Sequence, residues 1–275
     1  MTQQPAELKL SLSHRSLPVN RMRSLPRWAV LAFVAVAAAT LRADSDPNGG
    51  GGQPPPRDGH EFHFVRLAYT DVGFGRRQTW LTDWPEAEMH LIGGLRRLSR
   101  IDVSEENRYL TLRDEHLFEY PLLYAVEVGY WYLDDVEAER LRDYLLRGGT
   151  LVVDDFHGTA EWANFMESMR KVFPDRTVVD IPDTDPLFNI VHELDDRIQI
   201  PSIGVLFRGV TYERDGYTPH WRGIYDDQGR LMVIINFNMD LGDAWEHADT
   251  PEYALQYTNL AYKYAVNYVV YAMTH

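Results

Sequence analysis

The fold is decided by the stretch from residue 122 to residue 153, which contains LLYAV (122–126), DDVEAERLRDYLLR (134–147) and, after two glycines, TLVV (150–153). Two short apolar runs flank a segment in which Leu141 and Leu145 share one helical face. Asp134 followed by Glu137 matches a capping box at the start of that helix, and the glycines mark its end. A strand, a helix and a second strand in this order predict a parallel pair with a right-handed crossover, and hence a layered α/β fold.

Helices and strands are also expected on either side of this unit. Before it, apolar patterning predicts a strand at 62–69, a helix at 85–97 and a short strand at 109–112. After it, we expect a helix at 161–173, a strand at 177–179, a hairpin of 223–225 with 231–235, and a closing helix at 251–273. The region 182–220 is rich in Pro and Gly and is expected to be irregular.

The amino terminus has the residue order of a signal peptide. Arginines between residues 21 and 27 precede a mostly apolar run at 28–41, and small residues follow, so that cleavage is expected after Ala39 or Ala43. The run is shorter than the roughly 20 apolar residues that a membrane-spanning helix needs. We therefore predict a signal peptide at 1–43 and a periplasmic or secreted bacterial protein. The alternative is an uncleaved N-terminal membrane anchor.

Residues 44–60 are expected to form a disordered linker. They contain Asn48 followed by a run of glycines, and then Pro54-Pro55-Pro56. Such a segment buries too little apolar surface to offset the entropy of an ordered backbone. The remaining residues, 61–275, fall within the usual length of one domain and are predicted to form a single α/β domain.

Charge and composition exclude several classes of function. The chain has 27 Lys and Arg against 41 Asp and Glu, a net charge of −14, and the predicted signal peptide contains only one of the acids, Glu7. Such an acidic surface repels nucleic acid and anionic lipid. We therefore expect no nucleic-acid partner, and a membrane contact only through an uncleaved N-terminal segment. Because the chain has no cysteine, a disulfide framework, a thiolate metal site and a Cys nucleophile are excluded.

The first candidate site follows the strand predicted at 150–153. Ligands of parallel α/β sheets bind beyond the carboxyl ends of the strands, and the next residues here include Asp154, Asp155 and His157. Two carboxylates and an imidazole could hold a divalent metal ion or exchange a proton, so these residues are the candidates for catalysis and metal binding. The alternative is structural, with one Asp capping the next helix and His157 bonded to the backbone.

The second candidate site follows the strand predicted at 231–235. Its candidate ligand-binding residues are Asn236, Asn238, Asp240, Asp243, Trp245 and His247. The spacing only loosely matches a calcium-binding loop, because the placed glycine and the terminal acid of that loop are missing. The alternative is a turn-rich loop whose Asn and Asp side chains satisfy their own backbone. The sequence contains no nucleotide-binding fingerprint, so a divalent metal is the one cofactor for which it offers ligands.

Several of these segments together resemble domain-of-unknown-function family 4159. The resemblance rests on FVRL (64–67), GGTLVVDDFHG (148–158), the segment 236–245 and YAMTH (271–275), and extends over essentially all of 61–275. It implies a fold similar to class I glutamine amidotransferases, a flavodoxin-like three-layer sandwich with a mostly parallel sheet, in bacterial exported or membrane-associated proteins. In those enzymes a Cys nucleophile occupies the turn after a central strand, here Asp154 to Gly158. Without cysteine, glutamine hydrolysis by a thiolate is excluded.

These observations support two hypotheses of function. In the first, the domain is a binding or assembly module of the bacterial envelope, whose acidic loops recognise a small polar ligand or a partner protein. In the second, it is a metal-assisted hydrolase, in which Asp154, Asp155 or His157 holds the ion and Asp240 or His247 assists a water molecule. A fold alone does not decide between such functions. A shared metal site requires the two clusters to lie within about 5 Å of a common point.

Overall fold

The computed structural model describes residues 59–72 and 78–275. The predicted signal peptide at 1–43 lies outside the described residues, and so does the linker at 44–60 except for its last two residues. The cleavage sites, the linker and the export of the protein therefore stay predictions. Among the described residues, no helix is both long enough and apolar enough to cross a membrane.

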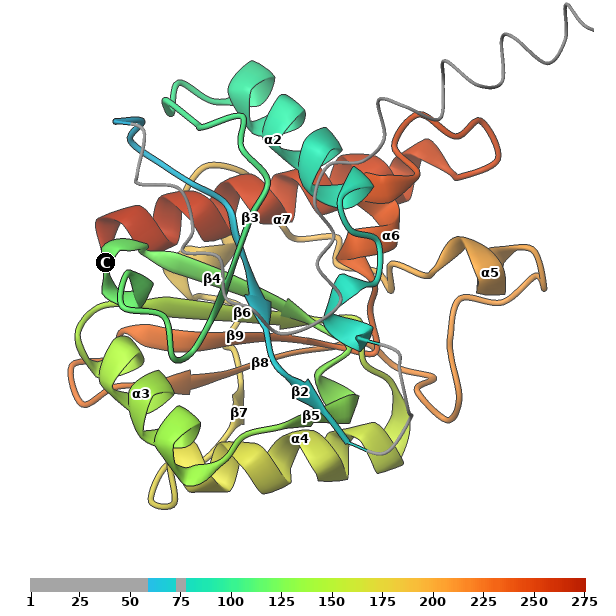
Figure 1. The fold of residues 1–275 in the computed structure, drawn as a ribbon. Helices are drawn as coiled ribbons and strands as arrows, with labels where there is room; N and C mark the ends of the chain where they lie inside the picture. Colours follow the sequence, from blue (N-terminus) through green and yellow to red (C-terminus); the bar gives the residue numbers. More distant parts are fainter. Residues whose placement is uncertain (1–58, 73–77) are drawn as a thin grey trace, which may run out of the picture. The chain divides into compact units, whose positions relative to one another are not determined.

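Seven strands form the central sheet, in the order β3-β1-β4-β6-β9-β8-β7 (Figure 1). The strands are β1 (Val65–Ala68), β3 (Arg108–Thr111), β4 (Leu122–Val126), β6 (Thr150–Asp154), β7 (Val179–Asp180), β8 (His220–Tyr225) and β9 (Leu231–Phe237). The first five strands in this order pair in parallel, whereas β8 pairs antiparallel with both β9 and β7. The order of the five parallel strands is that of flavodoxin-like folds, which confirms the predicted mostly parallel sheet.

The stretch 122–153 forms the strand–helix–strand unit that its pattern predicts. β4 and β6 pair in parallel along their whole length, and helix α3 (Asp135–Leu146) connects them. The capping box is present, because the Asp134 side chain accepts a bond from the backbone N–H of Glu137 while the Glu137 side chain accepts one from that of Asp134. Gly148 follows the helix with a φ of 109°, a left-handed conformation that glycine adopts without strain.

Helices cover both faces of the sheet and complete the three layers (Figure 1). The helices are α2 (Glu86–Leu98), α4 (Gly158–Val172), α6 (Leu241–Glu246) and α7 (Leu255–Thr274), together with α3. α3 and α4 pack over one apolar core, and α2, α6 and α7 pack over another. Successive β4 side chains alternate between the two cores, Tyr124 in one and Leu123 in the other. The strand is apolar throughout because both of its faces are covered.

Several short elements lie between these. They are the two-stranded sheet of β2 (Thr70–Asp71) and β5 (Trp131–Tyr132), the 3-10 helices at 79–81, 117–119, 128–130 and 186–188, and α5 (Ile203–Leu206). α5 lies in the region predicted to be irregular, and most of that region is indeed irregular.

Most predicted boundaries lie within three residues of those in the structure, and the more consequential differences lie after β8. A loop is predicted after β9, but the chain forms α6 there, because Asp240 accepts a bond from the backbone N–H of Asp243 and caps the helix. The closing helix begins at Leu255 rather than 251, because Tyr253 belongs to a turn and its hydroxyl donates to the Pro201 carbonyl. β9 continues to Phe237, two residues beyond its predicted end.

Candidate functional site

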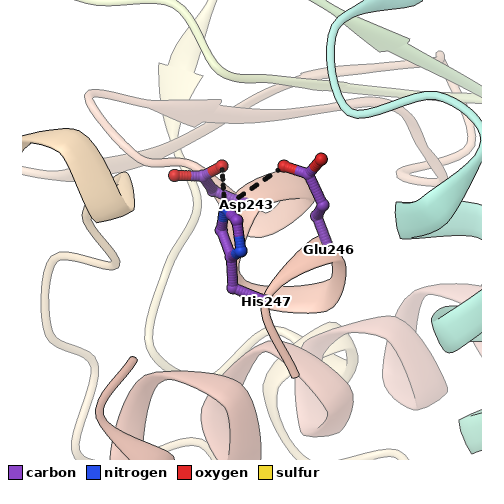
Figure 2. Close-up of side chains that lie close together, drawn as sticks. All are labelled: Asp243, Glu246 and His247. Atoms are coloured by element: carbon purple, nitrogen blue, oxygen red, sulfur yellow. Dashed lines mark ion pairs between the residues drawn. The ribbon is translucent and has the colours of Figure 1, made fainter. Parts of the chain in front are cut away.

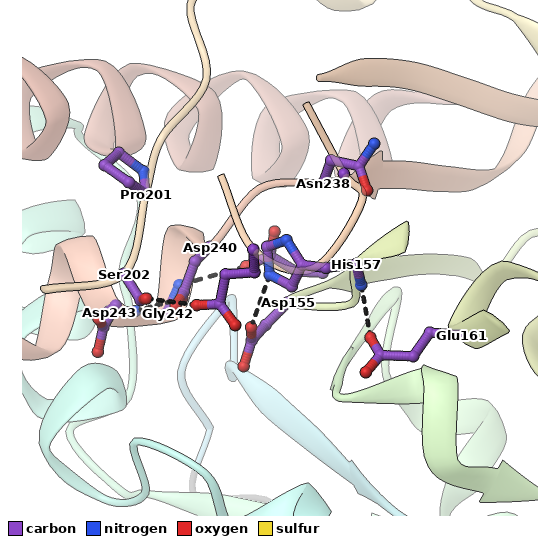
Figure 3. A network of polar contacts seen from close by, with 12 residues as sticks. Asp155, His157, Glu161, Pro201, Ser202, Asn238, Asp240, Gly242 and Asp243 are labelled. Atoms are coloured by element: carbon purple, nitrogen blue, oxygen red, sulfur yellow. Dashed lines mark hydrogen bonds and ion pairs between the residues drawn. The ribbon is translucent and has the colours of Figure 1, made fainter. Parts of the chain in front are cut away.

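The carboxyl ends of β1, β4, β6 and β9 meet at one edge of the sheet, and the strand order changes direction between β1 and β4. Doubly wound sheets bind their ligands at such a switch point. Acidic residues from several segments gather here, and we call them the acidic edge: Asp83, Glu127, Asp154, Asp155, Glu161, Glu213, Asp240 and Asp243. Figure 3 labels four of them, Asp155, Glu161, Asp240 and Asp243. Both candidate sites of the sequence therefore contribute to one edge.

The backbone is strained at this edge. Among the described residues, the non-glycine residues with positive φ are Asp83, Glu127, Asp155, Arg214 and Asn238, with values from 51° to 62°. All of them belong to the acidic edge or contact it, since Arg214 pairs with Glu161 and Asn238 accepts from the first residue of α4. Left-handed backbone at residues other than glycine costs free energy and concentrates at functional sites, where the surrounding structure maintains it. This distribution independently marks the edge as the functional part of the domain.

Three residues of the acidic edge, which we call the carboxylate triad, could hold a metal ion. Asp83 precedes α2, Asp240 caps α6 and Asp243 lies in its first turn; one carboxylate oxygen of each lies within 4.8 Å of the others. Asp83 Oδ2 is shielded from solvent, and no described residue donates a hydrogen bond to it. It lies so close to Gly242 that a Cβ there would come within 2.4 Å of it. Glycine at 242 thus leaves room for the Asp83 carboxylate beside α6.

Burial and mutual repulsion raise the pKa values of the triad. The pKa of Asp83 and that of Asp240 lie well above the ordinary value, first because both groups are buried and then because Asp155 and Asp243 repel the added charge. Burial, followed by Asp155 and Glu246, raises the pKa of Asp243 to about 7, although a bond from the Ile203 backbone opposes the shift. The metal-free triad therefore favours protonation, and a divalent cation would relieve the same repulsion.

A second group on α6 could also hold a metal ion (Figure 2). His247 Nε2 lies 3.3 Å from Glu246 Oε2 and 3.5 Å from Asp243 Oδ1. The spacing of i, i+3 and i+4 places all three side chains on one face of the helix. Asp243 belongs to both groups, so the carboxylate triad and this second group are adjacent.

Asp154 is completely buried and connects β6 to α6. Its Oδ2 accepts hydrogen bonds from the Tyr124 hydroxyl at 2.8 Å and from the backbone N–H groups of Leu241 at 2.7 Å and Gly242 at 3.2 Å. Burial raises the pKa of Asp154 to about 7, and the bond from Tyr124 opposes the shift. Neither metal-compatible group of the described residues includes Asp154. Its geometry is that of a residue that holds the N-terminus of α6 in place.

Asp155 and His157 form a buried pair in the turn after β6 (Figure 3). His157 Nε2 lies 3.2 Å from Asp155 Oδ1, and no described group bonds to His157 Nδ1. Burial alone would lower the pKa of His157, but the hydrogen bond and the charge of Asp155 outweigh it and raise the pKa. Neither metal-compatible group includes the pair. Asp155 nevertheless adds negative charge to the triad, because it raises the pKa of all three triad carboxylates.

Neither side chain caps the next helix, contrary to the structural alternative: His157 occupies the N-cap position of α4, but its side chain makes no capping bond. The first N–H groups of α4 donate instead to Asn238 Oδ1 at 2.9 Å and to Asp215 Oδ1 at 3.0 Å. Asn238 also donates from Nδ2 to the Thr218 carbonyl at 2.7 Å. Asn238 therefore connects β9, α4 and the 210–218 segment.

The other residues of the second cluster are divided between the core and the edge. Asn236 is buried on β9, where its Oδ1 accepts from the Tyr268 hydroxyl at 2.7 Å. Trp245 is buried against the rings of Phe64 and Tyr124. Of the six residues predicted there, Asp240, Asp243 and His247 belong to the two acidic and histidine groups that could hold a metal.

Sequence reasoning missed several members of the acidic edge, among them Glu127 and Asp83. Glu127 directly follows β4, so the rule that selected Asp154 also applied to it. Its pKa is raised to about 10, first by burial and then by Asp155 and Glu161. Asp83 lies between the 3-10 helix at 79–81 and α2, in a segment for which the sequence predicted neither an element nor a site.

The fold and the edge define an α/β protein of flavodoxin topology with an acidic switch-point site. The chain belongs to the family described as domain of unknown function (DUF4159), whose profile matches residues 63–273. The match covers nearly the whole described part and confirms the resemblance found in the sequence. A search of curated proteins found no match.

Proposed function

We propose that this domain is a binding module of the bacterial envelope, which holds a divalent cation in the carboxylate triad and a small polar ligand through it. The observation that carries the proposal is the convergence of three carboxylate oxygens within 4.8 Å, one of them buried without a hydrogen-bond donor among the described residues. Buried like charges at this separation strongly disfavour full ionisation. A cation removes that cost and completes the coordination of Asp83.

The chemistry of the triad favours a hard cation. All of its ligand atoms are carboxylate oxygens, which Ca²⁺, Mg²⁺ and Mn²⁺ prefer, and the chain has no thiolate. No Lys or Arg of the described residues forms an ion pair with Asp83, Asp240 or Asp243. Arg66, whose charge lowers the pKa of Asp83, is itself paired with Glu88, so the triad keeps a negative charge that an external cation can neutralise. Three protein ligands also leave coordination positions open, where a polar ligand can bind.

The binding test is isothermal titration of the purified full chain with CaCl₂, MgCl₂ and MnCl₂ after treatment with EDTA. We expect saturable binding of at least one cation, and an affinity at least tenfold lower in the Asp83→Asn and Asp240→Asn variants. Asn remains a good helix cap, so Asp240→Asn leaves α6 intact. The matched control is Asp227→Asn, an exposed Asp in the hairpin turn at the opposite edge. Absence of binding, or equal affinities in all variants, would contradict the proposal.

The envelope location rests on the N-terminal pattern and has its own test. Mass spectrometry of the protein from its native source should find a mature chain that begins at Thr40 or Asp44. A chain that retains residues 1–39 in the membrane fraction would support the N-terminal anchor instead. Met1 at the start of a cytoplasmic chain would contradict both.

Metal-assisted hydrolysis is the second candidate function, and the Asp155–His157 pair favours it. The pair occupies the turn that holds the nucleophile of class I amidotransferases, Asp155 is left-handed there, and the imidazole is buried beside the triad. A His–Asp pair beside a cation can accept a proton from water. Turnover of p-nitrophenyl phosphate or p-nitrophenyl acetate that requires the cation, and that His157→Gln abolishes without loss of cation affinity, would establish hydrolysis. Failure of the wild-type chain to hydrolyse either substrate would count against it.

A further inference from the structure

A buried ion pair joins strand β1 to helix α2 close to Asp83 of the carboxylate triad. Arg66 and Glu88 are both inaccessible to solvent, and Arg66 Nε donates to Glu88 Oε1 at 2.6 Å. The chain thus places a positively charged side chain on an interior strand of its sheet. The neighbouring β1 residues Val65 and Leu67 are apolar and buried, as expected for an interior strand.

Stability alone does not explain this pair. Removing two charges from water costs free energy that their attraction rarely exceeds, and replacing such pairs by apolar residues is often neutral or stabilising. The role of Arg66 therefore lies in the geometry that its remaining donors impose.

Those donors hold the segment that carries Asp83. Arg66 Nη1 donates to the carbonyl oxygen of Trp80 at 3.1 Å and to that of Thr82 at 2.8 Å. Thr82 directly precedes Asp83, whose backbone is left-handed with a φ of 62°. One guanidinium group thereby fixes the backbone that aims the Asp83 carboxylate at α6.

On its other side, Arg66 contacts the residues that hold α6. Its guanidinium carbon lies 5.2 Å from the ring centre of Tyr124, and the Tyr124 hydroxyl donates to Asp154. Asp154 accepts from the first N–H groups of α6, the helix of Asp240 and Asp243. Arg66, Tyr124 and Asp154 thus form a continuous buried connection between the two halves of the triad.

We propose that Arg66 is a positioning residue that sets the separation of Asp83 from Asp240 and Asp243, and thereby the cation affinity of the triad. This inference rests on the proposed cation site. Arg66 does not contact the ion; it acts through the carbonyl groups of Trp80 and Thr82. Outer residues that orient metal ligands typically change metal affinity 10- to 100-fold when they are replaced.

The test uses the full chain with Arg66→Met and Glu88→Leu combined, which removes both charges together and leaves neither unpaired. We expect a cooperative fold, a cation affinity 10- to 100-fold lower, and faster amide hydrogen exchange in residues 79–84. The matched control is Arg230→Met with Asp226→Asn. Arg230 also pairs with an acid and donates to a backbone carbonyl, that of Gly149, but it lies at the opposite edge of the sheet. The control should leave both the affinity and the exchange at 79–84 unchanged.

Unchanged affinity and unchanged exchange in the Arg66 and Glu88 double variant would overturn the inference, and so would an equal loss of affinity in the control. If the double variant does not fold, Arg66→Lys keeps the charge but cannot reproduce the guanidinium bonds to Glu88 and both carbonyls. The same two measurements then apply to it. A wild-type chain that binds no cation would refute the proposed function. In that case, faster exchange at 79–84 in the variant would still show that Arg66 holds the segment that carries Asp83. Unchanged exchange would show that Arg66 does not hold this segment.

Discussion

The Tyr124 hydroxyl donates a hydrogen bond to Asp154 Oδ2 at 2.8 Å, and the exposed fraction of both residues is 1% or less. The bond crosses from β4 to β6 at the point where α6 begins. It connects the apolar core to the acidic edge, because Tyr124 packs against Phe64 and Trp245 while Asp154 holds the N-terminus of α6.

Removal of this bond should destabilise the domain. Tyr124→Phe leaves the shape of the core unchanged but deprives a buried carboxylate of one donor, so we expect a loss of about 1–3 kcal/mol in the free energy of unfolding. Urea denaturation followed by Trp fluorescence measures the difference. Tyr109→Phe, at a half-exposed tyrosine of the edge strand β3, serves as the control and should change the stability by less than about 0.5 kcal/mol. Equal effects in the two variants would exclude the anchoring role of Tyr124.

The metal-free domain should lose stability as the pH rises from about 4 to about 10. The pKa of Asp154 is raised from 3.8 to about 7 and that of Glu127 from 4.5 to about 10, chiefly by burial. The native state therefore binds more protons than the unfolded state between these values. The contribution of each carboxyl group to stability is complete at a pH below its pKa in the unfolded state. It is lost as the pH rises through the pKa of the same group in the folded state.

Urea midpoints measured in EDTA should accordingly fall between about pH 6 and about pH 9, and Glu127→Gln should flatten the decrease at its alkaline end. The exposed acid Asp227, replaced by Asn, should leave the slope unchanged. A urea midpoint that rises over this pH interval would show that ionisation of these carboxyl groups does not destabilise the native state.

A single methyl group at position 242 should weaken the cation site. Gly242→Ala places a Cβ within 2.4 Å of Asp83 Oδ2, so the carboxylate must move away from Asp240 and Asp243. We expect cation affinity to fall at least tenfold by titration calorimetry, although Ala is favoured over Gly in a helix by about 1 kcal/mol. Gly204→Ala in α5, where the added Cβ meets no atom within 4 Å, should leave the affinity unchanged. Retained affinity in Gly242→Ala would place the ion away from Asp83.

The carboxylate triad and the second group on α6 should differ in the metal ions that they prefer, because their coordinating side chains differ. The second group contains an imidazole, which favours Zn²⁺ or Ni²⁺, whereas the triad consists of carboxylates alone. His247→Gln should therefore weaken Zn²⁺ binding several-fold without effect on Ca²⁺ or Mn²⁺, and Asp243→Asn should weaken both, because Asp243 belongs to both groups. Competition titrations with Zn²⁺ and Mn²⁺ measure the two effects. Equal losses for both ions in His247→Gln would mean that the groups form a single site.

Local patterns predicted most of the elements, because the contacts that define them lie close together in the sequence. The capping box of Asp134 and Glu137, the apolar face of Leu141 and Leu145, and the stop at Gly148 all act within one helix. α6 was missed because its signal was ambiguous. An Asp that accepts a bond from a backbone N–H three residues later can close a turn or cap a helix, and only the packing of Trp245 in the core favours the helix here.

The sequence by itself determined the strand–helix–strand unit, the mostly parallel sheet and the edge at which acidic side chains would gather, because strands that run in parallel end on the same side. Only the tertiary structure decided which acids converge. Asp83 and Asp240 lie far apart in the chain and meet because α2 and α6 pack on the same face of the sheet, while Asp154, adjacent to Asp155, is buried beneath α6. The residue type shows that an Asp or Glu side chain is able to bind a cation. Whether it is placed to do so depends on its burial, its hydrogen bonds and its distance from other charged groups, and these depend on the tertiary structure.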